Sequence, residues 1–157
     1  MWHTFQRPKA EVNVKCIPNK HLSSVDGTIH ITVANVRHKN IKFNLPNVLL
    51  DDGRIFETYI DGMSEPSKLP LDYSKINFPY LLIPRDTFEL QANSALLACL
   101  LKHNGYCGEV KIWFQFFDGI HKGTCKSGEY SISIDKTLKY TQSTFSLLLR
   151  EENKFKC

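Results

Sequence analysis

The sequence lacks the features that direct a chain into or across a membrane. It contains no run of 18 or more apolar residues, so we expect no membrane-spanning helix and no membrane partner. Its first eight residues, Met1 to Pro8, have no charged stretch followed by an apolar core, so we expect no signal peptide. No Asn-x-Ser/Thr acceptor for N-glycosylation occurs. We therefore expect a protein that is not secreted by a signal peptide.

Motifs that carry chemistry are also missing. The sequence has no Gly-x-Ser-x-Gly nucleophile elbow and neither of the glycine-rich loops that bind phosphate. Neighbouring carboxylates occur only as Asp51-Asp52 and Glu151-Glu152, which we interpret as a turn and a solvated tail. We therefore predict no catalytic residue, no cofactor and no enzymatic activity. An enzyme built on an unfamiliar β scaffold is the third functional hypothesis, after a protein of a larger assembly and a ligand-binding module.

The charge is only mildly positive. The 157 residues contain 20 Lys and Arg and 16 Asp and Glu, a net charge of +4, and the basic residues are spread along the chain. The densest basic cluster consists of Arg37, His38, Lys39 and Lys42. It is typical of a solvated turn or edge strand, with phosphate binding as the alternative. Nucleic acid is accordingly not an expected partner.

Five cysteines, an odd number, are widely and irregularly spaced, which does not indicate a disulfide framework. We expect thiols in a reducing compartment, either a virion or the cytoplasm of a host cell. Cys16 and Cys99 lie in apolar or alternating runs and are expected in the core, whereas Cys157 is terminal and expected to be exposed.

A metal site is the sharpest chemical hypothesis. Zinc takes four thiolate or imidazole ligands in a tetrahedron. Cys99 and four further candidates lie within 27 residues, and the four could meet across a hairpin: His103, Cys107, His121 and Cys125. No Cys-x-x-Cys pair is present, and the spacing matches no known structural zinc motif. We therefore predict no metal and interpret these residues as unrelated.

The strongest local pattern is that of antiparallel β-structure. Asp-Gly occurs four times and Asn104-Gly105 adds a fifth turn signal, mostly beside apolar or alternating runs. We expect strands at 11–17, 28–33, 40–45, 54–60, 80–83, 95–101, 110–117 and 130–134. The segment 95–101 is almost wholly apolar and is expected to be a central strand. The sequence thus predicts an all-β fold, an antiparallel β-sandwich of about eight strands, as a single domain over residues 1–157.

Two segments are less regular. Residues 62–77 contain two prolines and predict one long loop, which either covers an open end of the sandwich or binds a ligand. Residues 138–157 form a C-terminal tract that is either a last strand followed by a tail or a short helix that docks on a partner.

Aromatic and apolar residues nominate possible interfaces. Trp113, Phe114, Phe116 and Phe117 share one predicted strand, so two must point to each face. Either both faces are buried, or one presents an aromatic surface to a sugar or a protein. Apolar residues near the two termini are the candidate interface: Trp2, Phe5, Leu147, Leu148 and Leu149.

One stretch resembles a known family. A strand carrying Leu45-Pro46 precedes an Asp-Gly turn, and the short strand Leu82-Ile83-Pro84, an apolar segment near Ala95 and the run 108–114 follow. This order resembles the N-terminal β-sandwich domains of baseplate, fibre and other structural proteins of tailed bacteriophages. The resemblance implies a domain that attaches a fibre or receptor-binding module to a viral particle, and it carries no functional residues with it.

These observations predict a non-enzymatic structural or adaptor subunit of a larger protein assembly, such as a phage tail, baseplate or head fibre. Its expected partners are proteins, including further copies of itself, because most soluble oligomers are symmetric homo-oligomers. The alternative is a β-sandwich module that binds carbohydrate or another ligand through exposed aromatic residues and the segment 62–77.

Overall fold

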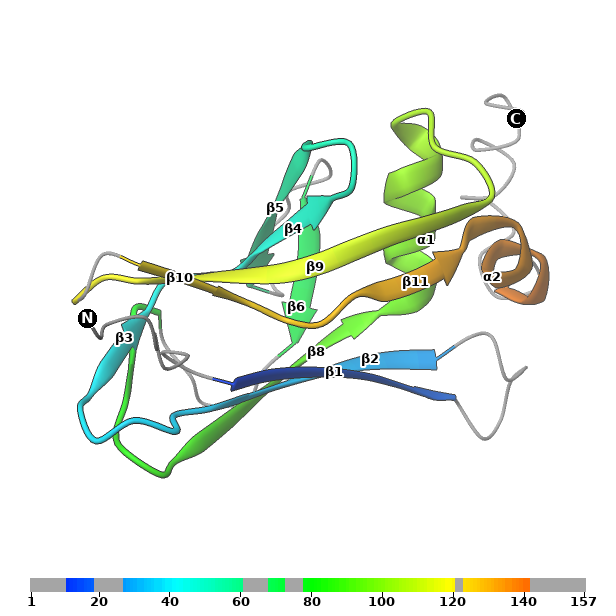
Figure 1. The fold of residues 1–157 in the computed structure, drawn as a ribbon. Helices are drawn as coiled ribbons and strands as arrows, with labels where there is room; N and C mark the ends of the chain where they lie inside the picture. The colour runs from blue at the N-terminus through cyan, green and yellow to red at the C-terminus, as the bar shows by residue number, and fades with distance from the viewer. Residues whose placement is uncertain (1–10, 19–26, 61–67, 73–77, 121–122, 142–157) are drawn as a thin grey trace.

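The computed structural model describes residues 11–18, 27–60, 68–72, 78–120 and 123–141. Within them lie eleven strands and two helices (Figure 1). In chain order they are β1 (Glu11–Pro18), β2 (Gly27–Ala34), β3 (Ile41–Phe43), β4 (Asn47–Leu50), β5 (Ile55–Ile60), β6 (Leu69–Asp72), β7 (Tyr80–Leu82), β8 (Thr87–Asn93), α1 (Ser94–His103), β9 (Glu109–Asp118), β10 (Gly123–Lys126), β11 (Tyr130–Ser133) and α2 (Ile134–Thr141).

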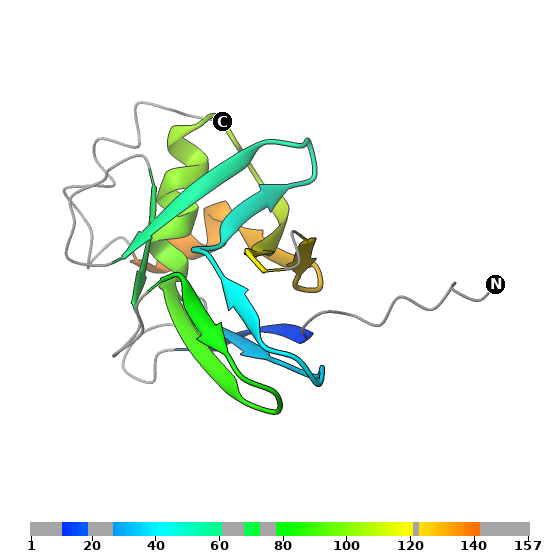
Figure 2. The same ribbon diagram turned by 90° about the vertical axis from the view of Figure 1, so that its left-hand side faces the viewer.

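The strands form two layers that face each other across the core, as the expected all-β fold requires. One layer, which we call sheet A, has the order β1-β2-β8-β6. The other, which we call sheet B, has the order β4-β9-β3-β7, with β10 and β11 also paired to β9. Strand β5 belongs to both, because it pairs with β4 along its first half and with β6 along its second. Figures 1 and 2 show α1 at one end of these layers, beside α2.

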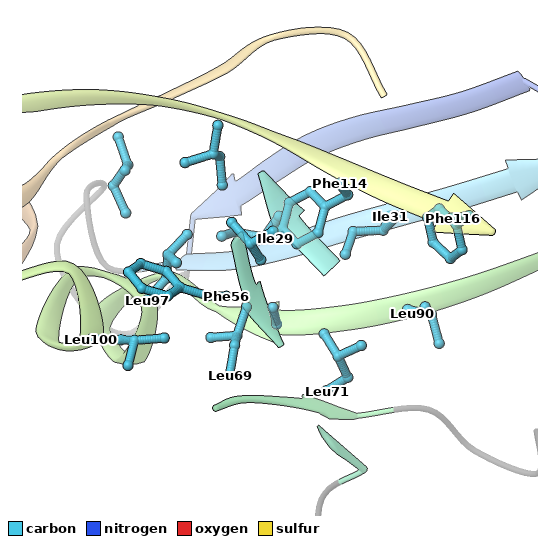
Figure 3. Packing of buried hydrophobic residues seen from close by; sticks show 14 of the residues in the cluster. Ile29, Ile31, Phe56, Leu69, Leu71, Leu90, Leu97, Leu100, Phe114 and Phe116 are labelled. Atoms are coloured by element: carbon cyan, nitrogen blue, oxygen red, sulfur yellow. The ribbon is translucent and has the colours of Figure 1, made fainter. Parts of the chain in front are cut away.

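The core follows from strict alternation along the strands. In β2, Ile29, Ile31 and Val33 are fully buried, and the residues between them are half-buried. Strands β8 and β9 repeat the pattern with Leu90 and Phe114 among the inward residues (Figure 3). Because successive side chains on a strand point to opposite faces, the two layers bury one apolar set between them.

Strand β9 is the centre of sheet B. Along one side it pairs with β11 and then β10, and along the other with β4 and then β3. On each side of β9, one partner strand ends and the next begins. Between β10 and β11 the Ser127 hydroxyl accepts from the Phe114 amide at 2.9 Å. Between β3 and β4 the Thr58 hydroxyl donates to the Pro46 carbonyl at 2.6 Å. These side chains satisfy backbone groups that would otherwise lie buried without a partner.

Helix α1 corrects the expectation of a central strand at 95–101. The Asn93 side chain accepts hydrogen bonds from the amides of Ala95 and Leu96 at 2.8 and 3.2 Å, which caps the first turn. The Ser94 hydroxyl accepts from the Gly27 amide and donates to the Gly27 carbonyl, which ties the helix to β2. An apolar run buried by packing is compatible with either structure, and here the cap and helix-forming Ala and Leu residues favour the helix.

Other expectations were partly wrong. Residues 62–77 are not one long loop, because β6 lies within them and pairs with β5 and β8. The β5–β6 pair is parallel, so the sheet is mixed and not wholly antiparallel. Strands β4, β6, β8 and β10 were not expected. In the C-terminal tract, residues 138–141 are helical as the last part of α2.

Candidate functional site

The outer face of sheet B carries an apolar row. Leu49 on β4 pairs with Ile55 on β5 and with Trp113 on β9, so these three side chains lie side by side on one face. Val48 and Phe114, their neighbours along the strands, point the other way and are fully buried. Ile55 is 51% exposed, and Leu49 and Trp113 are partly exposed. We call Ile55, Leu49 and Trp113 the apolar row.

A polar row lies next to it, two residues along each strand. Asn47 pairs with Glu57 on β5 and with Gln115 on β9, and Gln115 pairs with Lys126 on β10. The order across the face is Glu57, Asn47, Gln115 and Lys126, which we call the polar row. An acidic residue stands at one end and a basic residue at the other. The Lys126 ammonium also lies 5.9 Å from the centre of the Trp113 ring, a cation–π contact.

The apolar character continues towards the far end of sheet B. Phe117 follows Trp113 on the same face of β9 and is 41% exposed. Leu81 on the edge strand β7 is 47% exposed and pairs with Lys42. The two faces of the aromatic strand are therefore not buried alike: Phe114 and Phe116 are fully buried, whereas Trp113 is partly exposed and Phe117 is exposed.

The outer face of sheet A is polar by contrast. His30 on β2 lies with Nδ1 2.5 Å from the Glu89 carboxylate on β8. This hydrogen bond, with a smaller contribution from the imidazole charge, lowers the pKa of Glu89, against a weaker opposing effect of burial. The face therefore presents hydrogen-bonding groups where sheet B presents apolar side chains.

A depression of about 260 Å³ lies on the sheet A side, where β8 enters α1. Thr28 pairs with Asn93, and Asp72 pairs with Gln91, so three neighbouring strands supply four polar side chains. The remaining lining residues are Pro70, Ala92 and Leu96. Two of these seven residues, Pro70 and Asp72, belong to the segment 62–77 that the sequence nominated as a possible binding loop.

A third cluster joins the β4–β5 turn to the loop between α1 and β9. The Arg54 guanidinium lies 5.2 Å from the centre of the Phe56 ring and 5.3 Å from that of Tyr106. It also donates to the backbone carbonyl and side-chain oxygen of Asn104 at 3.3 and 3.2 Å. Every partner in this cluster belongs to the fold itself, so it has a structural role.

The cysteines depart from expectation. Cys107 is disulfide-bonded, so the prediction that all five cysteines are thiols was wrong. Cys99 and Cys125 carry thiol groups and pack partly buried against the core. Cys16 and Cys157 have side chains outside the described residues. Disulfides persist in oxidising surroundings. The predicted reducing compartment stays a prediction.

The candidate zinc ligands within the described residues, His103, Cys107 and Cys125, form no group that could hold a metal ion. A disulfide sulfur at Cys107 offers no thiolate, and His121 lies outside the described residues. Across the described part of the chain, no group of three or more His, Cys, Asp or Glu side chains could hold a metal ion.

The other nominated residues fall in two groups. Trp2, Phe5, Leu147, Leu148 and Leu149 lie outside the described residues, as do Glu151 and Glu152. The basic cluster 37–42 forms the connection from β2 into β3, and three of its four members are exposed.

Among the described helices, none is long and apolar enough to cross a membrane.

Comparison with known proteins yields little. No protein-family model and no curated protein matches the sequence. A solved structure, the crystal structure of a FixG-related protein from Vibrio parahaemolyticus, aligns with a TM-score of 0.38 and 13% identity. The alignment covers 81% of this chain and 97% of that one. A likeness of this level carries no functional argument, so function has to be argued from the surface itself.

Proposed function

We propose that this chain is a non-enzymatic structural or adaptor domain that docks on protein through the outer face of sheet B. One observation carries the proposal: the apolar row, three large apolar side chains held in register on an exposed sheet face. Soluble proteins tolerate scattered exposed apolar residues, whereas gathered ones are typical of interaction sites. A role in a tailed-phage particle is the specific form that the sequence resemblance implies.

The chemistry of this face favours a protein over a sugar. Sugar sites stack rings on aromatic side chains and bind hydroxyls with polar ones, and Trp113 with Asn47 and Gln115 supplies part of that set. The neighbouring exposed residues, however, are aliphatic on β5 and β7, Ile55 and Leu81. Aliphatic and aromatic groups together, with a polar border, are what the buried centre of a protein interface contains.

The test compares charged substitutions on the two outer faces. Leu49→Lys places a charge in the apolar row, and Gln91→Lys places the same charge on sheet A as the matched control. Association is measured for the purified chain by light scattering and for the tagged chain in its own cell extract by sedimentation. Loss of association with Leu49→Lys alone is the expected result. Association that survives Leu49→Lys in both settings would overturn the proposal.

A second candidate function rests on the depression lined by Thr28, Asp72, Gln91 and Asn93. Its hydroxyl, carboxylate and amides, beside Pro70 and Leu96, suit a small polyhydroxylated ligand such as a monosaccharide. Calorimetric titration against a panel of monosaccharides and polyols tests it. Binding that Asp72→Asn weakens tenfold or more is expected, and no heat from any member of the panel would eliminate this candidate.

A further inference from the structure

The two rows on sheet B have an arrangement that suits one occupant in particular. The polar row runs across four strands, from Glu57 on β5 to Lys126 on β10. At about 4.8 Å between strands, the two charges lie roughly 14 Å apart at opposite margins of the face. A face that meets its own copy must carry complementary groups at symmetry-related positions.

A two-fold axis parallel to the strands, above the gap between β4 and β9, meets this requirement. It places β5 of one copy over β10 of the other, and β4 over β9. Glu57 then faces Lys126 of the second copy, and Asn47 faces its Gln115. In the apolar row, Leu49 faces the Trp113 of the second copy. The three positions Glu57–Lys126, Asn47–Gln115 and Leu49–Trp113 are therefore matched in chemistry: charge with opposite charge, amide with amide, and apolar with apolar.

We propose that the outer face of sheet B binds a second copy of this chain in this two-fold arrangement. The inference rests on the proposed function, because it names the protein that the same face binds. Packing of the two sheets face to face would place them about 10 Å apart, which leaves room for one layer of side chains from each.

The size of the face is compatible with a dimer of modest affinity. Strand β9 has ten residues and is therefore about 33 Å long. The four strands β5, β4, β9 and β10 give a width of about 19 Å at the polar row, so the projected face is at most roughly 600 Å². Stable interfaces bury about 800 Å² of accessible surface per partner, so the dimer lies at the lower end of the range. Light scattering over a concentration series measures the dissociation constant of this dimer.

Charge reversal provides a test that only this arrangement passes. By symmetry Glu57→Lys makes both Glu57–Lys126 contacts repulsive, and Lys126→Glu does the same with opposite signs. Each variant alone is expected to dimerise roughly tenfold to a hundredfold more weakly than the original chain. An equimolar mixture of the two variants restores both contacts with opposite charges. The mixture is therefore expected to form a heterodimer as tight as the original dimer.

The controls separate this effect from a general change in charge. Asp72→Lys and Lys39→Glu make the same changes in net charge at exposed positions away from the two rows, and should leave dimerisation unchanged. Glu57 also pairs with Lys68 within the chain at 3.2 Å, so Lys68→Ala reports the loss of that contact alone. Circular dichroism checks that each variant folds. Should a reversal fail that check, Glu57→Gln and Lys126→Gln replace the reversals and should each weaken the dimer.

The outcomes are distinguishable. A chain that is monomeric by light scattering up to millimolar concentration, or a dimer that ignores both reversals, overturns the proposed self-association. So do two weakened variants that fail to associate when mixed. Where the purified chain is monomeric but its association in extract still depends on Leu49, the adaptor function stands and only its assignment to a second copy fails.

Discussion

The phenolic hydroxyl of Tyr106 donates a 2.5 Å hydrogen bond to Oδ2 of Asp52, 54 residues away along the chain. The contact holds the β4–β5 turn against the loop that leaves α1. Asp52 Oδ1 also accepts from the Arg54 amide at 3.0 Å within the turn. These two hydrogen bonds, the one from Tyr106 first, lower the pKa of Asp52. Burial, followed by the hydrogen bond to Asp52, raises the pKa of Tyr106.

The Tyr106–Asp52 contact should make stability depend on pH at both extremes. A carboxylate with a lowered pKa stabilises the fold above its ordinary value of 3.8, and this contribution is lost as pH falls through the lowered pKa. A phenol with a raised pKa stabilises the fold below its ordinary value of 10.0, and this contribution is lost as pH rises through the raised pKa. Tyr106→Phe should therefore lower Tm at neutral pH and flatten both limbs of its pH profile.

Differential scanning calorimetry from pH 2 to 11 measures this change. Tyr80→Phe is the matched control, since Tyr80 packs on Phe88 in the core and its Tm profile should keep the shape of the original. Acid and alkaline limbs that are as steep in Tyr106→Phe as in the original chain would show that the contact contributes nothing to the pH dependence.

Ser94→Ala should destabilise the fold more than its size suggests. The Ser94 hydroxyl is buried and makes two hydrogen bonds to Gly27, at 3.0 and 2.7 Å. Its removal leaves a buried amide and carbonyl without side-chain partners, which costs about 1–3 kcal/mol. Urea denaturation measures the loss, with the exposed Ser131→Ala expected to change stability by less than about 0.5 kcal/mol. Equal losses at both positions would contradict the assigned role.

Phe116 and Phe117 are neighbours in sequence with opposite roles. Phe116 is fully buried and its ring centre lies 5.6 Å from that of Phe43 and 6.1 Å from that of Phe88, both edge to face. Phe116→Ala should cost about 3–5 kcal/mol of unfolding free energy. Phe117→Ala should cost about 0.5 kcal/mol or less, because its ring lies on the outer face of sheet B. A reversed order in chemical denaturation would show that the two faces of β9 are assigned wrongly.

The disulfide at Cys107 predicts a thiol count. The chain has five cysteines, and one disulfide within it leaves 5 − 2 = 3 thiols. Alkylation of the denatured, unreduced protein should therefore add three groups by mass spectrometry, and five after reduction. Peptide mapping of the unreduced protein identifies the partner of Cys107. Five groups added without reduction would restore the expectation of a chain with thiols alone.

Most strands could be predicted because one physical signal, alternation, decides them. Residues 28–33 alternate and lie in β2, whereas residues 110–117 are nearly all apolar and lie in β9. The Asp52-Gly53 turn also holds, with Gly53 at a φ of +90°, a conformation that residues with a side chain rarely adopt. Gly105, at +89°, follows the end of α1 and does not close a hairpin. A dipeptide that ends in glycine can thus either close a hairpin or end a helix, and the local sequence does not distinguish the two.

The candidate site was predicted only in part. The sequence placed four aromatic residues on one strand but not the side on which the core lies, since that depends on which layers pack together. The apolar row depends on the register of β4 against β5 and β9, and β4 was not expected at all. The sequence alone therefore did not predict which residues lie beside Leu49. The depression on sheet A requires β6 to pair with β8, a contact between segments whose order no local pattern dictates.

Strand β5 pairs with a strand of each layer, so backbone hydrogen bonds join the two layers along β5. The opposite edges of the two layers have no such connection within the described residues. Along β5 the layers cannot part without breaking backbone hydrogen bonds. At the opposite margin β1 and β10 contact each other without being paired within the described residues. Brief openings of the core should therefore pivot about β5 and admit water first beside β1. Among the strands, the amide hydrogens of the edge strand β1 would exchange with solvent fastest and those of β5 most slowly, because the two layers open away from β5.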